Sequence, residues 1–467
     1  MIIVGGIFPP ALKLFAMKNV IFIFLGLFWL CACTKSEPVI NNEEELPSPE
    51  NESKVIKTEV KRSNGKWALY RDGKPYFIKG AGGGGEYVMW DNLKKYGGNS
   101  MRIYGINDNT SAALNMAEAN ELSVMIGISL PGENGFDYKD PVKCKTQLEN
   151  IRRNILKYKD HPAVLAWAIG NEIIGVNSSP EIFGFMNDVS EMIHQVDTNH
   201  PTLIVTAGIT TDLANKIADY IPDLDFVGVN WYAAIHLIYP NISQSRLNKP
   251  YVITEWGING PWEVGKTPWG TSVEPSSRVK AEQFRNRYAN HIVSHDDLCL
   301  GSYGFLWGQK PEGSPTWFGL FFNGEALEMV DELTKAWTGE YPDNRAPSIL
   351  NSTLNGFAAK GNVIIKNKET NKYTHEIYDF ENDELTVEYL IRPDNTTEGL
   401  IDDGKHSLPY LPNIISDETL TSCKLSFNEN HNGKSFRLFV FLRDSKNRIA
   451  TENRPFKVEL ENINVKK

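Results

Sequence analysis

The chain has 467 residues, enough for two folded domains, because domains usually contain about 100–200 residues and barrels are often larger. Hydrophobic residues make up 41% of it and charged residues 23%, a composition typical of globular proteins. The formal net charge of −10 argues against a nucleic-acid partner, since binding phosphates requires a basic surface.

Residues 1–33 have the pattern of a secretory signal. Met17, which gives a cleaner start than Met1, is followed by a lysine and by an apolar run that is short for a membrane span and ends in small residues. Leu30-Cys31-Ala32-Cys33 resembles the bacterial lipoprotein box, which implies a lipid on Cys33. We therefore expect attachment to a bacterial membrane, at the outer membrane or cell surface. An uncleaved membrane anchor is the alternative.

Residues 34–58 are acidic and contain few apolar side chains, so they cannot bury enough surface to fold. We expect a flexible tether here and a folded domain from residue 59. The remaining cysteines, Cys144, Cys299 and Cys423, are far apart and odd in number. Their spacing predicts neither a disulfide framework nor a metal site, and we expect no metal and no other cofactor.

Short apolar segments alternate with amphipathic ones between residues 59 and 342. A hairpin around Asp72-Gly73 comes first. Eight candidate strands follow at 77–80, 100–104, 123–128, 164–169, 202–206, 226–230, 251–254 and 304–307. This alternation over about 250 residues predicts a (β/α)₈ TIM barrel. A doubly wound sheet would need a nucleotide-binding loop, and the glycines at 82–85 lack the spacing of one.

The pattern changes after residue 342. Residues 343–467 lack helical periodicity and show short alternating strands separated by Asn, Asp and Gly turns. This favours an all-β, immunoglobulin-like sandwich as the second domain. Its sequence does not decide between a structural role and carbohydrate binding.

Two glutamates lie directly after apolar strands of the predicted barrel. Glu172 follows the fourth strand and Glu255 ends the seventh. In a barrel enzyme the active site lies at the carboxyl ends of the strands, and retaining glycoside hydrolysis needs two carboxyl groups about 5–5.5 Å apart. An acid that protonates a leaving group needs a raised pKa, and we expect partial burial or the neighbouring Glu255 to raise that of Glu172.

The segments Ile169-Gly-Asn-Glu172 and Thr254-Glu-Trp-Gly257 resemble, as a pair, the catalytic segments of glycoside hydrolase clan A. The resemblance covers residues 65–340, and the barrel looks like that of family 2 enzymes. It implies that Glu172 is the general acid/base and Glu255 the nucleophile of a retaining β-glycoside hydrolase.

The same resemblance implies roles for three polar neighbours. Arg102 would hydrogen-bond Glu255 and keep it ionised, Asn171 would contact the 2-hydroxyl of the sugar, and Tyr232 would donate to Glu255. The alternatives are a structural salt bridge for Arg102 and a core position for Tyr232.

Several aromatic residues are candidates for contacts with sugar rings. Trp307, at the end of the predicted eighth strand, is expected to form the floor of the site. The others lie after strands two, six and seven: Tyr104, Trp231, Trp256, Trp262 and Trp269.

A barrel followed by an immunoglobulin-like domain on a lipid tether resembles bacterial surface endo-β-1,3-glucanases. The resemblance implies a β-linked oligosaccharide or polysaccharide as substrate, most specifically β-1,3-glucan, and we expect a monomer. A β-mannanase or β-galactosidase type of hydrolase remains open, as do a β-glucan transglycosylase and a non-catalytic glycan-binding lipoprotein. A pure binding protein would have no need for both glutamates.

Overall fold

The computed structural model of the protein describes residues 54–83, 89–310, 312–358, 362–369, 371–394 and 409–461. The predicted signal sequence with Cys33 and the tether up to residue 53 lie outside these residues. Over the part of the chain that is described, no helix is both long and apolar enough to cross a membrane.

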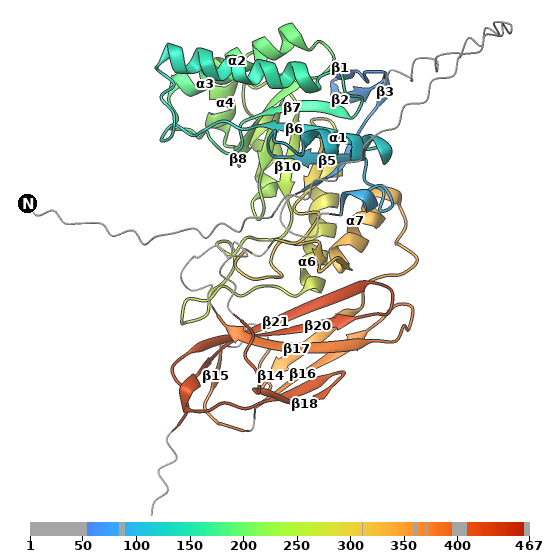
Figure 1. The fold of residues 1–467 in the computed structure, drawn as a ribbon, viewed down its shortest axis with the longest axis vertical. Coiled ribbons are helices and arrows are strands. Elements are labelled where there is room, and N and C mark those ends of the chain that lie inside the picture. Colours follow the sequence, from blue (N-terminus) through green and yellow to red (C-terminus); the bar gives the residue numbers. More distant parts are fainter. Residues whose placement is uncertain are drawn as a thin grey trace, which may run out of the picture. The chain divides into compact units, whose positions relative to one another are not determined.

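Eight parallel strands form a closed barrel surrounded by helices, which confirms the predicted TIM barrel (Figure 1). Almost every strand residue is buried, as expected for parallel strands that are covered on both faces. In pairing order the strands are β4 (Ile78–Gly82), β5 (Ser100–Ile103), β6 (Ser123–Ile128), β7 (Val164–Ile169), β8 (Thr202–Ala207), β9 (Phe226–Asn230), β10 (Tyr251–Trp256) and β11 (Cys299–Gly304). The helices are α1 (Thr110–Ala119), α2 (Pro141–Tyr158), α3 (Pro180–Val196), α4 (Thr211–Tyr220), α5 (Ile238–Ser243), α6 (Ser277–Arg287) and α7 (Glu328–Thr338).

The eighth barrel strand lies earlier in the chain than the sequence predicts. β11 ends at Gly304, where the predicted segment 304–307 only begins. Gly301 explains why the strand is hard to recognise, because glycine lowers strand propensity. A Cβ at Gly301 would lie 2.3 Å from the carbonyl oxygen of Ile78 in the neighbouring strand, so only glycine fits this close approach.

A small antiparallel sheet precedes the barrel. It consists of β1 (Thr58–Ser63), β2 (Lys66–Arg71) and β3 (Lys74–Pro75), which confirms the hairpin predicted around Asp72-Gly73. Backbone bonds from Thr58 to Asn199 and from Trp67 to Asp297 join it to segments that lead into barrel strands. The sheet therefore covers the end of the barrel opposite the expected active site.

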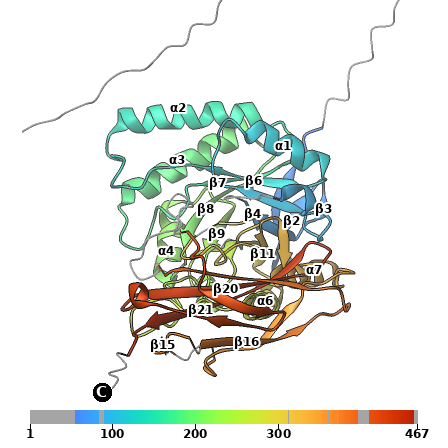
Figure 2. The same cartoon turned by 60° about the horizontal axis from the view of Figure 1, so that its bottom comes forward.

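The residues beyond 342 form two sheets that share an apolar core, which confirms the predicted β-sandwich (Figure 2). One sheet consists of β14 (Ser348–Leu354), β16 (Asn371–Tyr378), β19 (Ser422–Leu425) and β18 (Ile415–Thr419). The other contains β17 (Thr386–Pro393), β20 (Ser435–Arg443), β21 (Arg448–Val458) and β15 (Val363–Ile365), with β12 (Phe321–Phe322) and β13 (Glu325–Leu327) from the segment that follows β11.

The second sheet of the sandwich thus includes strands that lie before residue 342. β13 pairs in parallel with β21, for example through Ala326 and Arg448. Beside this pairing, the rings of Phe322 and Phe441 stack with their centroids 4.5 Å apart. The barrel and the sandwich therefore share both a sheet and an apolar contact.

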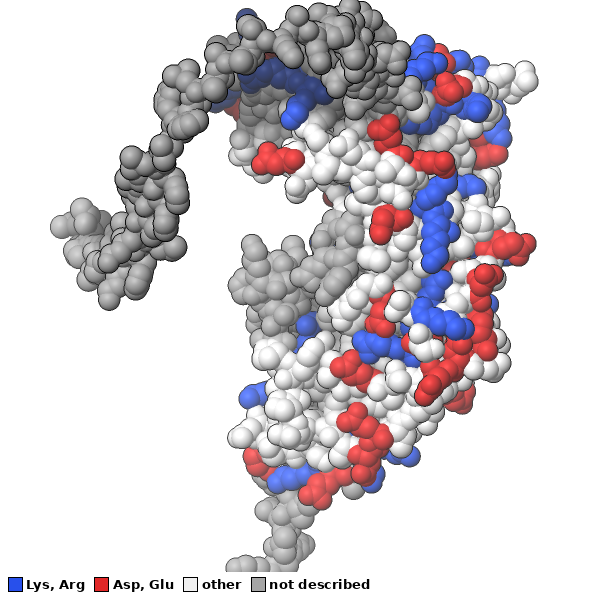
Figure 3. All heavy atoms as spheres, turned by 45° about the vertical axis from the view of Figure 1, so that its right-hand side comes forward, with Lys and Arg blue, Asp and Glu red and all other residues white. Residues whose placement is uncertain are grey.

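Charged side chains of opposite sign lie next to one another on the face shown in Figure 3. Exposed ion pairs such as Arg278–Glu282, at 2.7 Å, occur along the described chain. Such exposed pairs contribute about 0–1 kcal/mol each. The fold therefore depends mainly on its apolar core and on buried polar contacts.

Candidate active site

Glu172 and Glu255 line one cavity of about 410 Å³ at the carboxyl ends of the barrel strands. Glu172 follows β7 and Glu255 is the penultimate residue of β10. The lining consists of Gly83, Tyr104, Asn171, Glu172, Tyr232, Glu255, Trp262, Phe305, Leu306, Lys310, Glu312 and Phe318. The two glutamates chosen for their positions after strands therefore meet in one place.

A sharp backbone turn after β7 presents Glu172 to the cavity. Gly170 has a φ of +71°, and Glu172 itself has a φ of +58°, in the left-handed region. A non-glycine residue in this region costs on the order of 1–3 kcal/mol and is typical of functional sites. The turn persists because the Glu172 amide donates to the carbonyl of Val205 in β8, at 2.9 Å.

Strand alternation separates Glu255 from the tryptophan that follows it. Neighbouring side chains of a strand point to opposite faces, so Glu255 points into the barrel mouth and Trp256 toward the helices. Glu255 is 7% exposed. Glu172, by contrast, is exposed. Of the two environments expected around Glu172, the structure shows the neighbouring glutamate and not burial.

Asn230, the last residue of β9, bridges the two carboxylates. Its Nδ2 lies 2.8 Å from Oε1 of Glu172 and 2.9 Å from Oε1 of Glu255. These two oxygens are therefore no further apart than the sum of the distances, about 5.7 Å. That limit fits the spacing of about 5–5.5 Å in retaining enzymes and is below the roughly 6.5–9.5 Å of inverting ones.

The amide of Asn230 has a defined orientation, because its Oδ1 accepts a bond from Thr254 Oγ1 at 2.7 Å. Asn230 was not among the predicted site residues. A search of strand ends for amides as well as acids would have found it.

The contacts expected at Glu255 are present. Arg102 Nη1 lies 3.0 Å from its Oε1, and the Tyr232 hydroxyl donates to its Oε2 at 2.9 Å. Asn171 Oδ1 accepts from Arg102 Nη2 at 2.7 Å, which leaves the Asn171 amide nitrogen for a ligand. The Tyr104 ring lies under this arginine, with its centroid 4.4 Å from Cζ. Arg102, Asn171, Tyr104 and Tyr232 thus surround the base of the cavity.

The electrostatics of Glu255 result from opposing effects. Burial raises the pKa of this carboxyl, the positive charge of Arg102 opposes the rise, and Glu172 adds to it. The hydrogen bond from Tyr232 favours the ionised form and lowers the pKa. Together these effects leave the pKa of Glu255 above its ordinary value.

Replacing Tyr232 by phenylalanine should move the acid limb of the kcat/KM–pH profile to higher pH. Loss of the bond destabilises ionised Glu255 and so raises its pKa further. We also expect kcat to fall about 10–100-fold, because a hydrogen bond to a charged group contributes roughly 1.5–3 kcal/mol. Tyr239→Phe is the matched control, since Tyr239 bonds Asp297 outside the cavity. An unshifted limb in Tyr232→Phe would contradict the assignment.

Four aromatic rings form one side of the cavity, which we call the aromatic wall: Tyr232, Trp262, Phe305 and Phe318. Ring centroids of Phe305 and Phe318 lie 5.9 and 5.7 Å from that of Tyr232. Trp262 is 61% exposed beside Phe318, so its indole face is available to a ligand. Phe305 and Phe318 were not predicted. Phe305 directly follows β11, but the predicted eighth strand, 304–307, includes it within the strand and so did not place it at the strand end.

Four predicted sugar contacts are not among the described residues that line this cavity. Full burial contradicts a direct contact for Trp307 and Trp256, whereas the roles of Trp231 and Trp269 stay predictions. Trp307 is fully buried, and its indole N–H donates to the Met89 carbonyl at 2.8 Å and to Asn92. Trp256 is fully buried against Phe284. The other two, both partly buried, are Trp231, against Gly208, and Trp269. The burial of Trp307 and Trp256 results from contacts with distant segments, which residue type does not reveal.

The barrel is similar to a domain of known proteins. Residues 99–297 match the family model of glycosyl hydrolases family 2, TIM barrel domain. No curated protein matches the chain. Similar solved structures include a β-D-glucuronidase of Dictyoglomus thermophilum (18% identity, TM-score 0.47, covering 61% of this chain and 54% of that one). A β-galacturonidase of Eisenbergiella tayi has 18% identity and a TM-score of 0.47, covering 62% and 55%. A putative β-galactosidase of Bacteroides fragilis has 14% identity and a TM-score of 0.45, covering 87% and 58%.

The chain spans little more than half the length of each of these three proteins. The stretch that matches the family model contains both glutamates and the strands that carry them. Over this stretch the barrel is therefore similar to the TIM barrel domain of family 2 glycosyl hydrolases.

Proposed function

We propose that the protein is a retaining β-glycoside hydrolase that cleaves a β-glucan, with Glu172 as general acid/base and Glu255 as nucleophile. The observation that carries this proposal is the pair of carboxylates that share Asn230 Nδ2 at the mouth of the barrel. Their separation leaves no room for a water molecule between a base and the sugar, as inversion would require.

The reaction follows from the positions of the two carboxyl groups. Glu172 gives its proton to the glycosidic oxygen while Glu255 attacks the anomeric carbon, which breaks the glycosidic bond and forms a glycosyl ester. Glu172, now a carboxylate, takes a proton from water, and the resulting hydroxide displaces Glu255. Two inversions restore the β configuration. Arg102, Asn230 and Tyr232 hold Glu255 in place for attack.

The charges of the cavity support a neutral sugar. Among the described residues of its lining are Glu172, Glu255 and Glu312 but a single lysine, Lys310. The Lys310 ammonium lies 2.5 Å from the Glu312 carboxylate and is therefore already neutralised. A uronic acid would bring a further negative charge next to these carboxylates. The aromatic wall instead fits the apolar face of a neutral pyranose.

The finer assignment, an endo-acting β-1,3-glucanase, is supported by the sequence resemblance described above. The proposal includes a lipid anchor at Cys33, a location at a bacterial outer membrane or cell surface, and action as a monomer. A surface location would bring the barrel to polysaccharides outside the cell.

An activity screen with laminarin, mixed-linkage β-glucan, β-mannan, aryl β-glycosides and an aryl β-glucuronide tests the proposal. We expect shortened β-1,3-glucan products whose newly formed ends are first seen by NMR as the β-anomer. Products longer than the substrate would indicate transglycosylation in place of hydrolysis. An α-anomer would contradict retention, and cleavage of the glucuronide alone would contradict a neutral substrate. No turnover of any substrate would overturn the function.

Replacing Trp262 by alanine should raise KM for an oligosaccharide about tenfold and leave kcat within about threefold, because the residue contributes ring stacking and no proton transfer. Thermal unfolding should be nearly unchanged, since exposed side chains affect stability by about 0.5 kcal/mol or less. Tyr220→Ala, which removes another exposed ring outside the cavity, is the control. An unchanged KM in Trp262→Ala would remove this residue from the site.

A further inference from the structure

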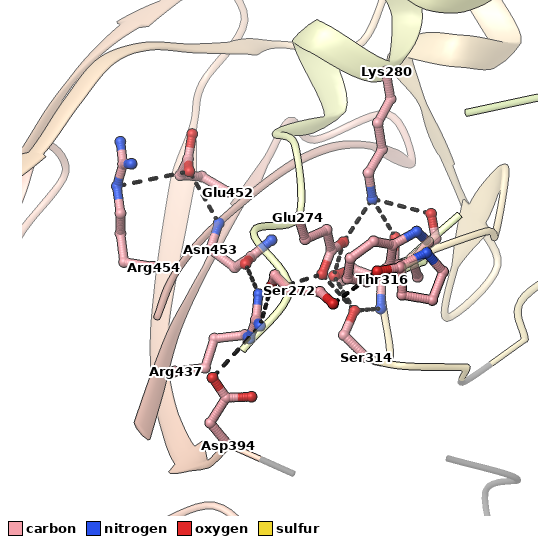
Figure 4. A network of polar contacts seen from close by, with 12 residues as sticks. Ser272, Glu274, Lys280, Ser314, Thr316, Asp394, Arg437, Glu452, Asn453 and Arg454 are labelled. Carbon is pink, nitrogen blue, oxygen red and sulfur yellow. Dashed lines mark hydrogen bonds and ion pairs between the residues drawn. The ribbon is translucent and has the colours of Figure 1, made fainter. Parts of the chain in front are cut away.

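A cluster of buried polar side chains joins two loops of the barrel to the C-terminal sandwich (Figure 4). The β10 loop comprises residues 257–276. The β11 loop comprises residues 305–320, of which 311 lies outside the described part. Trp262 belongs to the first loop, and Phe305 and Phe318 belong to the second. Three rings of the aromatic wall therefore depend on the conformation of these loops.

Glu274, at the end of the β10 loop, is the centre of the cluster. Its carboxylate lies 2.6 Å from Lys280 Nζ, and it accepts bonds from Ser314 and Thr316 of the β11 loop at 2.5 and 2.8 Å. Burial alone would raise the pKa of Glu274, but Lys280 and Arg437 outweigh it and lower the pKa. The carboxylate is therefore charged and binds both loops together.

Lys280 connects the cluster to the backbone beside Phe318. Its ammonium donates to the carbonyl oxygens of Thr316 and Trp317 at 2.6 and 3.1 Å. The Trp317 indole N–H in turn donates to the carbonyl of Asn259 in the β10 loop, at 3.0 Å. The two loops are thus joined at two separate points, through Glu274 and through Trp317.

Arg437, on β20 of the sandwich, completes the connection and is 1% exposed. Its Nη2 donates to the carbonyl of Ser272 at 2.8 Å, and its Nη1 donates to Asn453 on β21 at 2.5 Å. The hydroxyl of Ser272 donates to the carbonyl of Pro261 at 2.8 Å, directly before Trp262. A continuous chain of contacts therefore leads from the sandwich to the exposed indole.

We propose that Arg437 is a positioning residue through which the sandwich, by way of Ser272, holds Trp262 in place to bind a sugar ring. The nature of the ligand rests on the proposed function, whereas the contacts do not. A loop that is ordered before the ligand arrives loses less entropy on binding, so the contacts increase affinity without touching the ligand. The C-terminal domain thus contributes to substrate affinity although none of its described residues lines the cavity.

Affinity measured by calorimetry in a Glu255→Gln background, which does not turn over substrate, tests this role. The ligand is the oligosaccharide that the wild type cleaves fastest, or a β-1,3-linked glucohexaose if none is cleaved. We expect Arg437→Met to weaken binding about tenfold and Ser272→Ala about threefold. Ser272→Ala keeps the carbonyl contact with Arg437 and removes only the bond to Pro261, so it tests the proposal even if Arg437→Met does not fold.

Arg454→Met is the matched control. Arg454 is also a buried arginine of the sandwich, but its Nη2 donates to the Ser352 carbonyl at 2.6 Å, between the two sheets. We expect less than a twofold change in affinity. An equal loss of affinity in Arg437→Met and Arg454→Met would overturn the proposal, because it would show that any loosening of the sandwich has this effect.

A double-mutant cycle separates positioning from general damage. If Arg437 acts through Trp262, then Trp262→Ala combined with Arg437→Met should bind no more weakly than Trp262→Ala alone. In the active enzyme, Arg437→Met should raise KM about tenfold and leave kcat within about threefold. Additive effects on affinity, or a loss confined to kcat, would overturn the positioning role.

Hydrogen exchange distinguishes a failure of this proposal from a failure of the proposed function. Arg437→Met should increase exchange in peptides from 257–276, and Arg454→Met should not. A wild type that cleaves no glycoside would contradict the function but leave this expectation intact. Unchanged exchange in the β10 loop, or failure of the Glu255→Gln parent to bind the oligosaccharide, would overturn the positioning role itself.

Discussion

Glu255→Ala should reduce kcat/KM by about 10⁴-fold or more, because no other group in the described cavity can attack the anomeric carbon from the same position. The variant should fold, since the change removes a buried carboxylate whose burial is unfavourable. Arg102 and Asn230 would lose a partner at this position, and water can enter the open cavity to replace it.

Azide should restore part of the activity and identify the role of each glutamate. In Glu255→Ala, azide replaces the missing nucleophile and attacks from its side, so a β-glycoside should yield an α-glycosyl azide. In Glu172→Ala the glycosyl ester still forms, and azide should displace it to yield a β-glycosyl azide. A β-glycosyl azide from Glu255→Ala and an α-glycosyl azide from Glu172→Ala would reverse the assignment of roles.

Glu282→Ala serves as the control for both variants. Glu282 is on the surface of α6 in an exposed pair with Arg278 and lies outside the cavity. Its activity should equal that of the wild type. Wild-type activity in Glu255→Ala as well would show that the site lies elsewhere.

Lys280→Ala should destabilise the folded protein by about 3–5 kcal/mol, because it leaves Glu274 charged and without its nearest cation in a fully buried position. The midpoint of urea unfolding gives the measurement, with Arg278→Ala as the control. Arg278 is an exposed arginine paired with Glu282, so its removal should lower the free energy of unfolding by no more than about 1 kcal/mol.

Replacement of both partners provides a sharper version of this test. Lys280→Met combined with Glu274→Leu should recover most of the lost stability, since apolar residues of similar size can replace a buried ion pair with little loss. Substrate affinity should remain impaired, because the bonds that Lys280 makes to the β11 loop would still be missing. Equal stability of Lys280→Ala and wild type would show that the pair has no structural importance.

The sequence predicts the barrel and the two glutamates because these depend on local signals. Apolar segments of strand length, followed by acidic residues, identify β7 and β10 without knowledge of contacts. Arg102 and Tyr232 follow from the resemblance, and each makes the expected contact with Glu255.

The predictions that are wrong depend on contacts between distant segments. Whether Trp307 or Phe305 faces the cavity depends on where β11 ends, which is at Gly304. The exposure of Trp262 and the burial of Trp256 likewise depend on neighbouring loops and helices. The connection from Arg437 to Ser272 joins residues 165 positions apart, so no local pattern could reveal it.

The shared sheet has a consequence for how the protein can be divided. A chain ending at residue 342 would leave β13 without its partner β21 and expose Phe322, creating an unpaired edge that promotes aggregation. We expect such a truncated protein to be insoluble. In the intact chain, we expect the barrel and the sandwich to unfold together in one cooperative calorimetric transition. The barrel is therefore not an autonomous module. Any exchange of the C-terminal region between related enzymes would have to carry the strands that precede residue 342 with it.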